Sequence, residues 1–296
     1  MDGILNLNKP IGPTSFELVR LVKQLTEEKR VGHGGTLDPL ASGVLPILIG
    51  QATRVSEFFL HGSKAYRATV RLGVSTDTYD AEGTIVNEGD VSEVKQRDLV
   101  RVLESFKGPV WQRPPAFSAL KRDGQRLYKL ARSGRPVEVE ERLVNIHRIE
   151  VVDWSRPTAI IEIECGHGTY VRTIAHDLGE KLGCGGHLVG LVRTRTGPFQ
   201  VDDALTIEAL HDAFHGGYLQ DSMFSVDAPL LGLPAAIVDG KLQESIAHGK
   251  AIPVNGSPHL APDTLCRAFN ERGEFIALMR FDACTEYWRP TKVFLR

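Results

Sequence analysis

A glycine-rich loop places a histidine and an aspartate five residues apart. Residues 33–39 read HGGTLDP, and the two glycines allow the backbone to approach a ligand closely. Pro39 restricts Asp38 to an extended or turn conformation, which presents its carboxylate at a fixed place. An ordinary turn is the alternative, because Asp, Pro and Gly are all turn residues, and turn preferences alone favour it. No P-loop or dinucleotide fingerprint is present here, so a nucleotide cofactor is not expected.

A second segment that could do chemistry is GHGTYVRT, residues 166–173. It places Tyr170 and Arg172 where a strand ends and a helix begins. A cation is disfavoured near a helix N-terminus, so Arg172 predicts a carboxylate partner from elsewhere in the chain. The alternative is a surface arginine beside a core tyrosine. Tyr66, on the apolar side of a predicted strand, fits the core by default but could also present its ring to a base.

The composition is that of a globular protein, and it argues against a general nucleic-acid coat protein and a membrane-anchored protein. The chain has 296 residues, 42% apolar and 24% charged, with a net charge of -2. No apolar run is long enough to span a bilayer. The first residues lack the charged-then-apolar pattern of a secretory signal peptide. The four cysteines form no pair or cluster with zinc spacing. We therefore expect no metal, no membrane contact and a reducing, cytoplasmic location.

One stretch is strongly basic although the whole chain is nearly neutral. Residues 121–135, KRDGQRLYKLARSGR, carry six basic residues and one acidic residue. A local basic stripe suits a partner that binds one face of the protein. Charge alone favours a simpler interpretation, a helix whose Lys and Arg side chains are solvated.

These residues must be positioned by a mixture of strands and helices. Thr14 and Glu17 have capping-box spacing for a first helix, and residues 66–74 alternate like a half-buried strand. Irregular alternation of the elements predicts an α+β fold with a mixed or mostly antiparallel sheet. The further predicted elements are a strand near the N-terminus, helices over about 94–106 and from about 170, strands over 144–152 and 159–165, and an excursion with a short helix over about 108–140.

The chain also divides near residue 230. The segment DAPLLGLP, residues 227–234, has the composition of a linker, and short β-like runs separated by turns follow it. We therefore expect a catalytic domain over 1–230 and a small β-rich module over 235–296.

Four blocks of sequence resemble the TruB family of tRNA pseudouridine synthases. The resemblance runs in order through most of residues 3–200, and the G-x-LDPLA-x-G-x-LP run is its most specific part. The blocks are NKPIGPTS (8–15), GHGGTLDPLASGVLPILIG (32–50), KAYRATVRLG with STDTYDAEG (64–83) and CGHGTYVRTIAHDLGEKLGCGGHL (165–188). The last 60 or so residues match more loosely and look like the PUA-type RNA-binding module of many members.

The resemblance implies a role for individual residues. Asp38 corresponds to the family's essential aspartate and Arg172 to the arginine that pairs with it. The residues implied to surround the target uridine are His33, Tyr66, Tyr170 and Leu191. Where many members read L-R-R-T, this chain has Val192 before Arg193, so only one of two candidate phosphate-binding arginines is present. Lys121, Arg122, Arg126 and Lys129 fall in the family's thumb insertion, which favours RNA contact for the basic stripe.

The implied reaction converts the uridine at position 55, in the T arm of a transfer RNA, to pseudouridine without a cofactor. The base must first be extruded, at a cost of a few kcal/mol, and stacking on Tyr66 can return about 1–3 kcal/mol. Asp38 must be ionised, which a nearby Arg172 would favour. Attack at C1′, attack at C6 and a glycal route all remain open.

Three other functions compete with this one. A tRNA-binding or folding factor would use the same RNA-contacting parts. A guide-RNA-dependent synthase usually carries long basic tails, which this chain lacks, so we expect a monomer that acts on tRNA with no obligate protein partner. A base-excising glycosidase could also use a lone aspartate beside an arginine.

Overall fold

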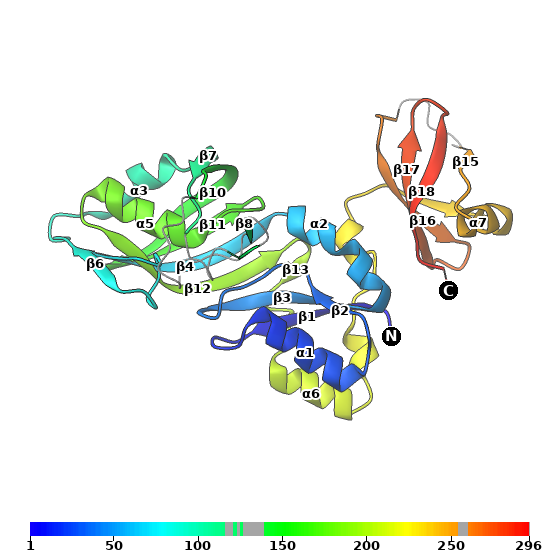
Figure 1. Cartoon of the computed structure of the whole chain (residues 1–296), viewed down its shortest axis with the longest axis horizontal. Coiled ribbons are helices and arrows are strands. Elements are labelled where there is room, and N and C mark those ends of the chain that lie inside the picture. Colours follow the sequence, from blue (N-terminus) through cyan, green and yellow to red (C-terminus); the bar gives the residue numbers. More distant parts are fainter. Residues whose placement is uncertain (116–120, 123–124, 127–138, 254–259, 296) are drawn as a thin grey trace.

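A nine-stranded mixed sheet forms the framework of the N-terminal part in the computed structural model (Figure 1). The structure describes residues 1–115, 121–122, 125–126, 139–253 and 260–295. The strands run in the order β1-β3-β12-β4-β11-β10-β7, with β2 beside β3 and β13 beside β12. Only β12 and β3 pair in parallel among the described strands of this sheet. The strand bounds are β1 Gly3–Lys9, β2 Val31–His33, β3 Ala41–Ile49, β4 Lys64–Leu72, β7 Gly108–Gln112, β10 Arg142–Ser155, β11 Thr158–Cys165, β12 Gly186–Thr196 and β13 Phe199–Gln200.

Helices flank this sheet, and the predicted α+β class is confirmed. The Thr14 hydroxyl accepts from the Glu17 N–H, and the Glu17 carboxylate accepts from the Thr14 N–H, which is the predicted capping box. The helix from residue 170 begins after Tyr170 and ends at Gly183, which has the left-handed conformation that glycine tolerates. The bounds of these helices are α1 Ser15–Thr26, α2 Ser56–His61, α3 Gln96–Glu104, α5 Val171–Leu182 and α6 Ile207–His215, whereas α7 Gly240–Ala247 packs on the C-terminal sheet described below.

The larger core lies between one half of the sheet and helices α3 and α5. Strand β4 alternates as predicted: Tyr66, Ala68 and Val70 are buried, while Arg67 and Arg71 are exposed. The buried side chains pack beneath both helices together with residues of β10 and β11. This packing fixes α5, which carries Arg172, against the strand that carries Tyr66.

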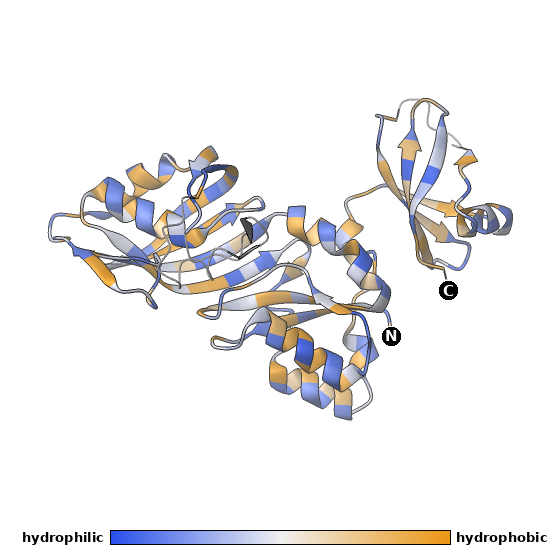
Figure 2. Cartoon of the chain, in the orientation of Figure 1, coloured by the Kyte–Doolittle hydropathy of each residue, from blue (hydrophilic) through white to orange (hydrophobic). Residues whose placement is uncertain are grey.

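The other half of the sheet is covered by α1 and α6. Their apolar faces, including Leu18, Val22 and Leu210, pack on Leu5 and Leu45 of β1 and β3. Orange and blue bands alternate along both helices in Figure 2, because each helix keeps a polar face for solvent. Since β2 and β3 belong to this half, the loop between them lies where the two halves meet.

Two small hairpins extend from the main sheet. One pairs β5, Val74–Thr76, with β6, Ile85–Glu88. The other pairs β8, Lys121–Arg122, with β9, Gln125–Arg126, inside the insertion predicted over 108–140. The predicted start is wrong, because residues 108–112 form β7 of the main sheet and the insertion begins after Gln112. The short helix expected inside the insertion lies outside the described residues.

A separate five-stranded sheet follows residue 234 (Figure 1). Its strands are β14 Ala235–Val238, β15 Ile252–Pro253, β16 Leu265–Asn270, β17 Phe275–Asp282 and β18 Tyr287–Val293. The predicted linker is itself packed, because Leu230 forms an apolar cluster with Val55, Leu278 and Phe294. The predicted linker therefore connects the two parts of the chain through a small apolar core. We call this packed connection the joint.

Candidate active site

The loop that carries Asp38 is held on both sides by hydrogen bonds. Ser15, at the start of α1, is buried, and its hydroxyl both accepts from Leu37 N–H at 2.8 Å and donates to Leu37 C=O at 3.1 Å. On the other side, the Ala41 N–H donates to Asp38 C=O at 3.0 Å. These contacts fix the backbone around Asp38, while its side chain stays 40% exposed. The carboxylate is therefore accessible but held in a defined place.

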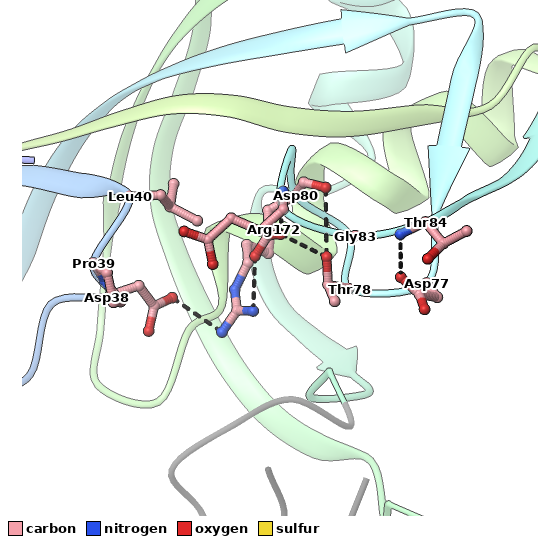
Figure 3. Close-up of a pocket in the computed structure, with 10 residues that line it drawn as sticks. Asp38, Pro39, Leu40, Asp77, Thr78, Asp80, Gly83, Thr84 and Arg172 are labelled. Carbon is pink, nitrogen blue, oxygen red and sulfur yellow. Dashed lines mark hydrogen bonds and ion pairs between the residues drawn. The ribbon is translucent and has the colours of Figure 1, made fainter. Parts of the chain in front are cut away.

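Arg172 joins two carboxylates through one guanidinium group. Its Nη2 lies 3.0 Å from Asp38 Oδ2, and its Nη1 lies 3.0 Å from Asp80 Oδ2. Figure 3 shows Asp38 and Asp80 approaching the guanidinium from different loops. The carboxylate partner expected for a cation at a helix N-terminus is thus present, and a second carboxylate accompanies it. The arrangement makes Asp38 a charged acceptor beside a fixed cation.

Asp80 is a site residue that the sequence reasoning missed. Its Oδ1 accepts from the Thr78 hydroxyl at 2.5 Å and from the Glu82 N–H at 3.1 Å, so Oδ2 is left to face Arg172. The stretch DTYDAEG reads by composition only as an acidic loop. The useful signal is a carboxylate flanked by threonine hydroxyls that can fix its orientation.

A cavity of about 340 Å³ lies beside the Asp38–Arg172 pair. Its walls include the predicted residues Tyr66, Tyr170 and Leu191, together with Asp38 and Arg172 themselves. The volume falls at the lower end of the range for small-molecule pockets, which suits one nucleoside unit. A further cavity of about 360 Å³ lies against the same ion pair. It is lined by residues of the loop between β5 and β6, which carries Asp80 (Figure 3).

Tyr66 reaches this cavity from β4, with only 9% of its surface exposed. Burial raises the pKa of the Tyr66 phenol, so the group stays protonated at neutral pH. The positive charge of Arg193, together with a hydrogen bond from its side chain, opposes part of that rise in pKa. A neutral ring on the cavity wall can stack on a flat, uncharged base.

The structure places Arg193 inside the protein, on the wall of the same cavity, and its contact with RNA stays a prediction. Its side chain is 1% exposed, and its guanidinium donates to the carbonyl oxygens of Val44 at 2.7 Å, Gly35 at 3.1 Å and Thr36 at 3.3 Å. Its hydrogen-bonding capacity is thus directed at the backbone of the segments on either side of Asp38. We assign Arg193 the role of anchoring the loop that leads to Asp38.

A lysine that the sequence reasoning did not select also contributes to the cavity wall. Lys64 lines the cavity, and its ammonium donates to the carbonyl oxygens of Phe59, Leu60 and Gly62 at 3.0–3.2 Å. It therefore caps the C-terminal end of α2. Burial lowers the pKa of Lys64 to about 8.

A second buried lysine lies under the Asp38 loop. Lys9 donates to Ala41 C=O at 2.6 Å and to Pro10 C=O at 3.0 Å. Burial lowers its pKa to about 8, and the nearby Asp38 carboxylate opposes that shift. Lys9 therefore supports the segment that follows Asp38 and contributes positive charge close to it.

The remaining predicted residues are less directly placed. His33 is half-buried on β2, accepts from the Gly35 N–H at 3.2 Å through Nδ1, and is not among the residues that line the two cavities. Burial lowers the pKa of His33, which leaves the ring neutral at pH 7. Lys121, Arg122 and Arg126 belong to the β8–β9 hairpin, and Lys129 lies outside the described residues.

Neither a metal centre nor a membrane helix is found in the described part of the chain. Within those ranges, no three His, Cys, Asp or Glu side chains are grouped as metal ligands. The described helices also lack the length and apolar character needed to cross a bilayer. The four cysteines are free thiols.

Comparisons with known proteins identify related sequences along nearly the whole chain. Residues 23–171 match the N-terminal domain of TruB family pseudouridylate synthases, and residues 172–231 match the tRNA pseudouridylate synthase B C-terminal domain. The tRNA pseudouridine synthase B of Dehalococcoides mccartyi (strain CBDB1) is 40% identical over 296 residues, 100% of this chain and 97% of that protein. The protein of the same name in Symbiobacterium thermophilum is 44% identical over 254 residues, 85% of this chain and 83% of that protein.

Solved structures share the fold over the same length. A chain of a Cbf5-Nop10-Gar1 complex superposes with a TM-score of 0.75 at 27% identity, covering 99% of this chain and 85% of that one. A chain of an H/ACA RNP bound to a substrate RNA containing 2′-deoxyuridine gives a TM-score of 0.76 at 26% identity, with the same coverage. The similarity extends through both sheets.

Proposed function

The chain belongs to the TruB family of pseudouridylate synthases, and on that basis we propose that it converts the uridine at position 55 of the transfer RNA T arm to pseudouridine. Curated relatives at about 40% identity over their whole length carry the name tRNA pseudouridine synthase B, which supports tRNA as the substrate. We further propose Asp38 as the catalytic carboxylate, acting in the cytoplasm without a cofactor.

One observation carries the assignment of Asp38. Its carboxylate is paired with Arg172 at 3.0 Å on the wall of a cavity of about 340 Å³ that Tyr66, Tyr170 and Leu191 also line. A fixed carboxylate, a cation paired with it and an aromatic surface for a base meet in one place. An ordinary turn aspartate would need none of these neighbours.

The chemistry requires only rearrangement of bonds within one nucleotide. The C1′–N1 bond breaks, the uracil turns, a C1′–C5 bond forms, and the proton on C5 is released while N1 gains a proton. An ionised Asp38 can attack C1′, attack C6, or remove a sugar proton in a glycal route. In each of these routes the Arg172 guanidinium provides a fixed positive charge 3.0 Å from the Asp38 carboxylate.

We propose that the target uridine is flipped into the cavity before reaction. Extrusion of a base costs a few kcal/mol, and stacking on an aromatic ring returns about 1–3 kcal/mol. Tyr66 offers a neutral, largely buried ring for that stacking, while Tyr170 and Leu191 provide further walls. His33, from the adjoining β2, is proposed to lie near the flipped nucleotide.

Two other parts are proposed to bind the rest of the tRNA. The insertion that begins after Gln112 carries Lys121, Arg122, Arg126 and Lys129, whose charges suit phosphate contacts. The β-rich module over 235–296 is proposed as a PUA-like RNA-binding module, attached to a catalytic domain over 1–230. We propose that the protein acts as a monomer with no obligate protein partner.

An assay with a bare tRNA transcript tests the proposal. The purified protein should release tritium from [5-³H]uridine in that transcript, and carbodiimide-blocked primer extension should map one new stop to position 55. Binding without release would support a folding factor, and loss of the base would support a glycosidase. Because the structural neighbours come from H/ACA complexes, a reaction that requires an added guide RNA would support the guide-dependent alternative.

A further inference from the structure

We propose that Gln112 is a positioning residue that holds Tyr170, and through it Arg172, in register with Asp38. Gln112 is the last residue of β7 and is 4% exposed. Its side chain reaches from the edge strand of the sheet to the residue that precedes α5. This inference rests on the proposed function, because it takes the Asp38 cavity as the reacting site.

The contact between Gln112 and Tyr170 uses both polar groups of one amide side chain. Gln112 Nε2 donates to Tyr170 C=O at 2.9 Å, and Gln112 Oε1 accepts from Tyr170 N–H at 2.7 Å. The side chain thus imitates a strand neighbour and fixes the peptide groups on both sides of one Cα. A methionine would fill the same space but would offer neither bond.

The residue held in this way is the N-cap of α5. Tyr170 has extended backbone angles, its C=O also accepts from Ile174 N–H at 3.3 Å, and Arg172 follows two residues later. Tyr170 lines the cavity with Asp38. A shift of the Tyr170 backbone would therefore move both a wall of the cavity and the cation that faces the carboxylate. Displacements of about 1 Å in an active site can cost about a hundredfold in rate.

A second bond links the same two segments. The Thr173 hydroxyl, on the first turn of α5, donates to Arg113 C=O at 3.1 Å, and Thr173 is buried. Two successive residues, Gln112 and Arg113, therefore hold the first turn of the helix. Their bonds reinforce each other because they act on opposite ends of that turn.

Gln112 also lies at the base of the basic insertion. Gln112 pairs with Arg142 in the ladder between β7 and β10, so it lies where the basic insertion leaves the sheet and returns to it. The residue that holds Tyr170 is thus the root of the segment proposed to contact tRNA. A displacement of Gln112 would therefore also displace Tyr170, because the two residues are joined by two hydrogen bonds.

The test compares two Gln112 variants with a control on the opposite edge of the sheet. Gln112→Met removes both bonds, and Gln112→Glu keeps the acceptor but donates to Tyr170 C=O only when protonated. Asn6→Leu is the control, because Asn6 is 1% exposed, lies on β1, and donates to Gln200 C=O at 2.8 Å. Single-turnover rates at saturating tRNA, tRNA affinity and melting temperature are measured for each.

We expect Gln112→Met to react at least about tenfold more slowly with tRNA affinity within about threefold of the parent. The rate of Gln112→Glu, relative to the parent at each pH, should rise as pH falls from 8 to 6, because a buried carboxylic acid retains its proton to higher pH and donates again. Combination of Gln112→Met with Tyr170→Phe should cost less than the product of the two single effects, since both act through Tyr170. Asn6→Leu should lower only the melting temperature.

A rate for Gln112→Met within twofold of the parent, or a ratio for Gln112→Glu that does not change with pH, would overturn the inference. Should Gln112→Met fail to fold, the pH dependence of Gln112→Glu decides alone. Asp38→Asn is assayed in parallel. If Asp38→Asn is inactive and the Gln112 variants resemble the parent, only this inference fails. If Asp38→Asn remains active, the proposed function fails as well.

Discussion

Arg172 and Asp80 form an ion pair of 3.0 Å whose side chains are only 8% and 4% exposed. Asp38 binds the same guanidinium but is 40% exposed. The two carboxylates therefore have different consequences for the protein. Asp80 neutralises the charge of the Arg172 guanidinium, which is buried away from solvent. Asp38 presents its own charge to the cavity.

Replacement of Asp80 by Asn tests this division of roles. The amide still fits and can accept a hydrogen bond, but it removes the charge that holds Arg172 in place. We expect turnover to fall by at least about tenfold, with tRNA affinity within a few-fold of the parent. Asp77→Asn is the matched control, because Asp77 lies in the same loop, is exposed, and accepts from Thr84 N–H, which an amide can also do. Equal rates for the two variants would show that the buried charge is not needed.

The buried ammonium of Lys64 predicts a dependence of stability on pH. The folded protein releases this proton near its pKa of about 8, whereas the unfolded chain holds it until about 10.5. Unfolding then takes up a proton between these values, so the contribution of Lys64 to stability rises with pH from about 8 to 10.5. Three hydrogen bonds to the charged form oppose the shift, so we expect less than about 3 kcal/mol.

Urea unfolding at pH 7, 8, 9 and 10 measures this effect. The difference in unfolding free energy between the parent and Lys64→Met should move in favour of the parent as pH rises. Lys107→Met is the control, because Lys107 lies at the surface, and its difference from the parent should stay constant. A constant difference for Lys64→Met would mean that its ammonium remains protonated in the folded protein up to pH 10.

The basic stripe of the insertion should set the salt dependence of tRNA binding. Changing Lys121, Arg122, Arg126 and Lys129 to Gln should weaken binding. On a duplex, the slope of log K against log salt should fall by about 0.9 for each phosphate group that the variant no longer neutralises. The control removes the same charge from the exposed residues around α3, which are Lys95, Arg97, Arg101 and Lys107. If both sets change the slope equally, net charge alone controls binding.

Much of this framework could be predicted because its signals are local. The capping box of Thr14 and Glu17, the alternation along β4 and the glycine end of α5 each depend on residues within one element. The Asp38–Arg172 pair follows from the family resemblance and from the placement of a cation at a helix start. The proline and glycine around Leu230 predict a linker. This local signal does not reveal the apolar cluster that Leu230 forms with the distant residues Val55, Leu278 and Phe294.

The interactions that were missed join residues far apart in the chain. Asp80 meets Arg172 across 92 positions, and Arg193 reaches Gly35 across 158. The sequence favours a surface position for Arg193, since arginine is usually exposed, but here backbone carbonyls satisfy it inside the protein. No periodicity within either segment reveals such pairings, which depend on how β3, β12 and α5 pack.

The C-terminal module should be separable from the catalytic part, at a measurable cost. Truncation after Leu233 removes Leu278 and Phe294 from their cluster with Val55 and Leu230, so the melting temperature should fall. We expect weaker tRNA affinity with reaction retained at saturating tRNA. Phe294→Ala in the full chain is the control, because it loosens the joint but keeps the module. A truncated protein that melts without cooperativity would show that the two parts share one folding unit.

The replacement of Asp38 by Asn tests the central claim most directly. The amide keeps the size and turn geometry, and it can still accept from Arg172, so folding should change little. It cannot act as a carboxylate nucleophile or as a base. We predict almost complete loss of pseudouridine formation in the single-turnover tritium-release assay, with tRNA affinity within a few-fold of the parent. A rate within about tenfold of the parent, equivalent to about 1.4 kcal/mol in barrier, would contradict the account.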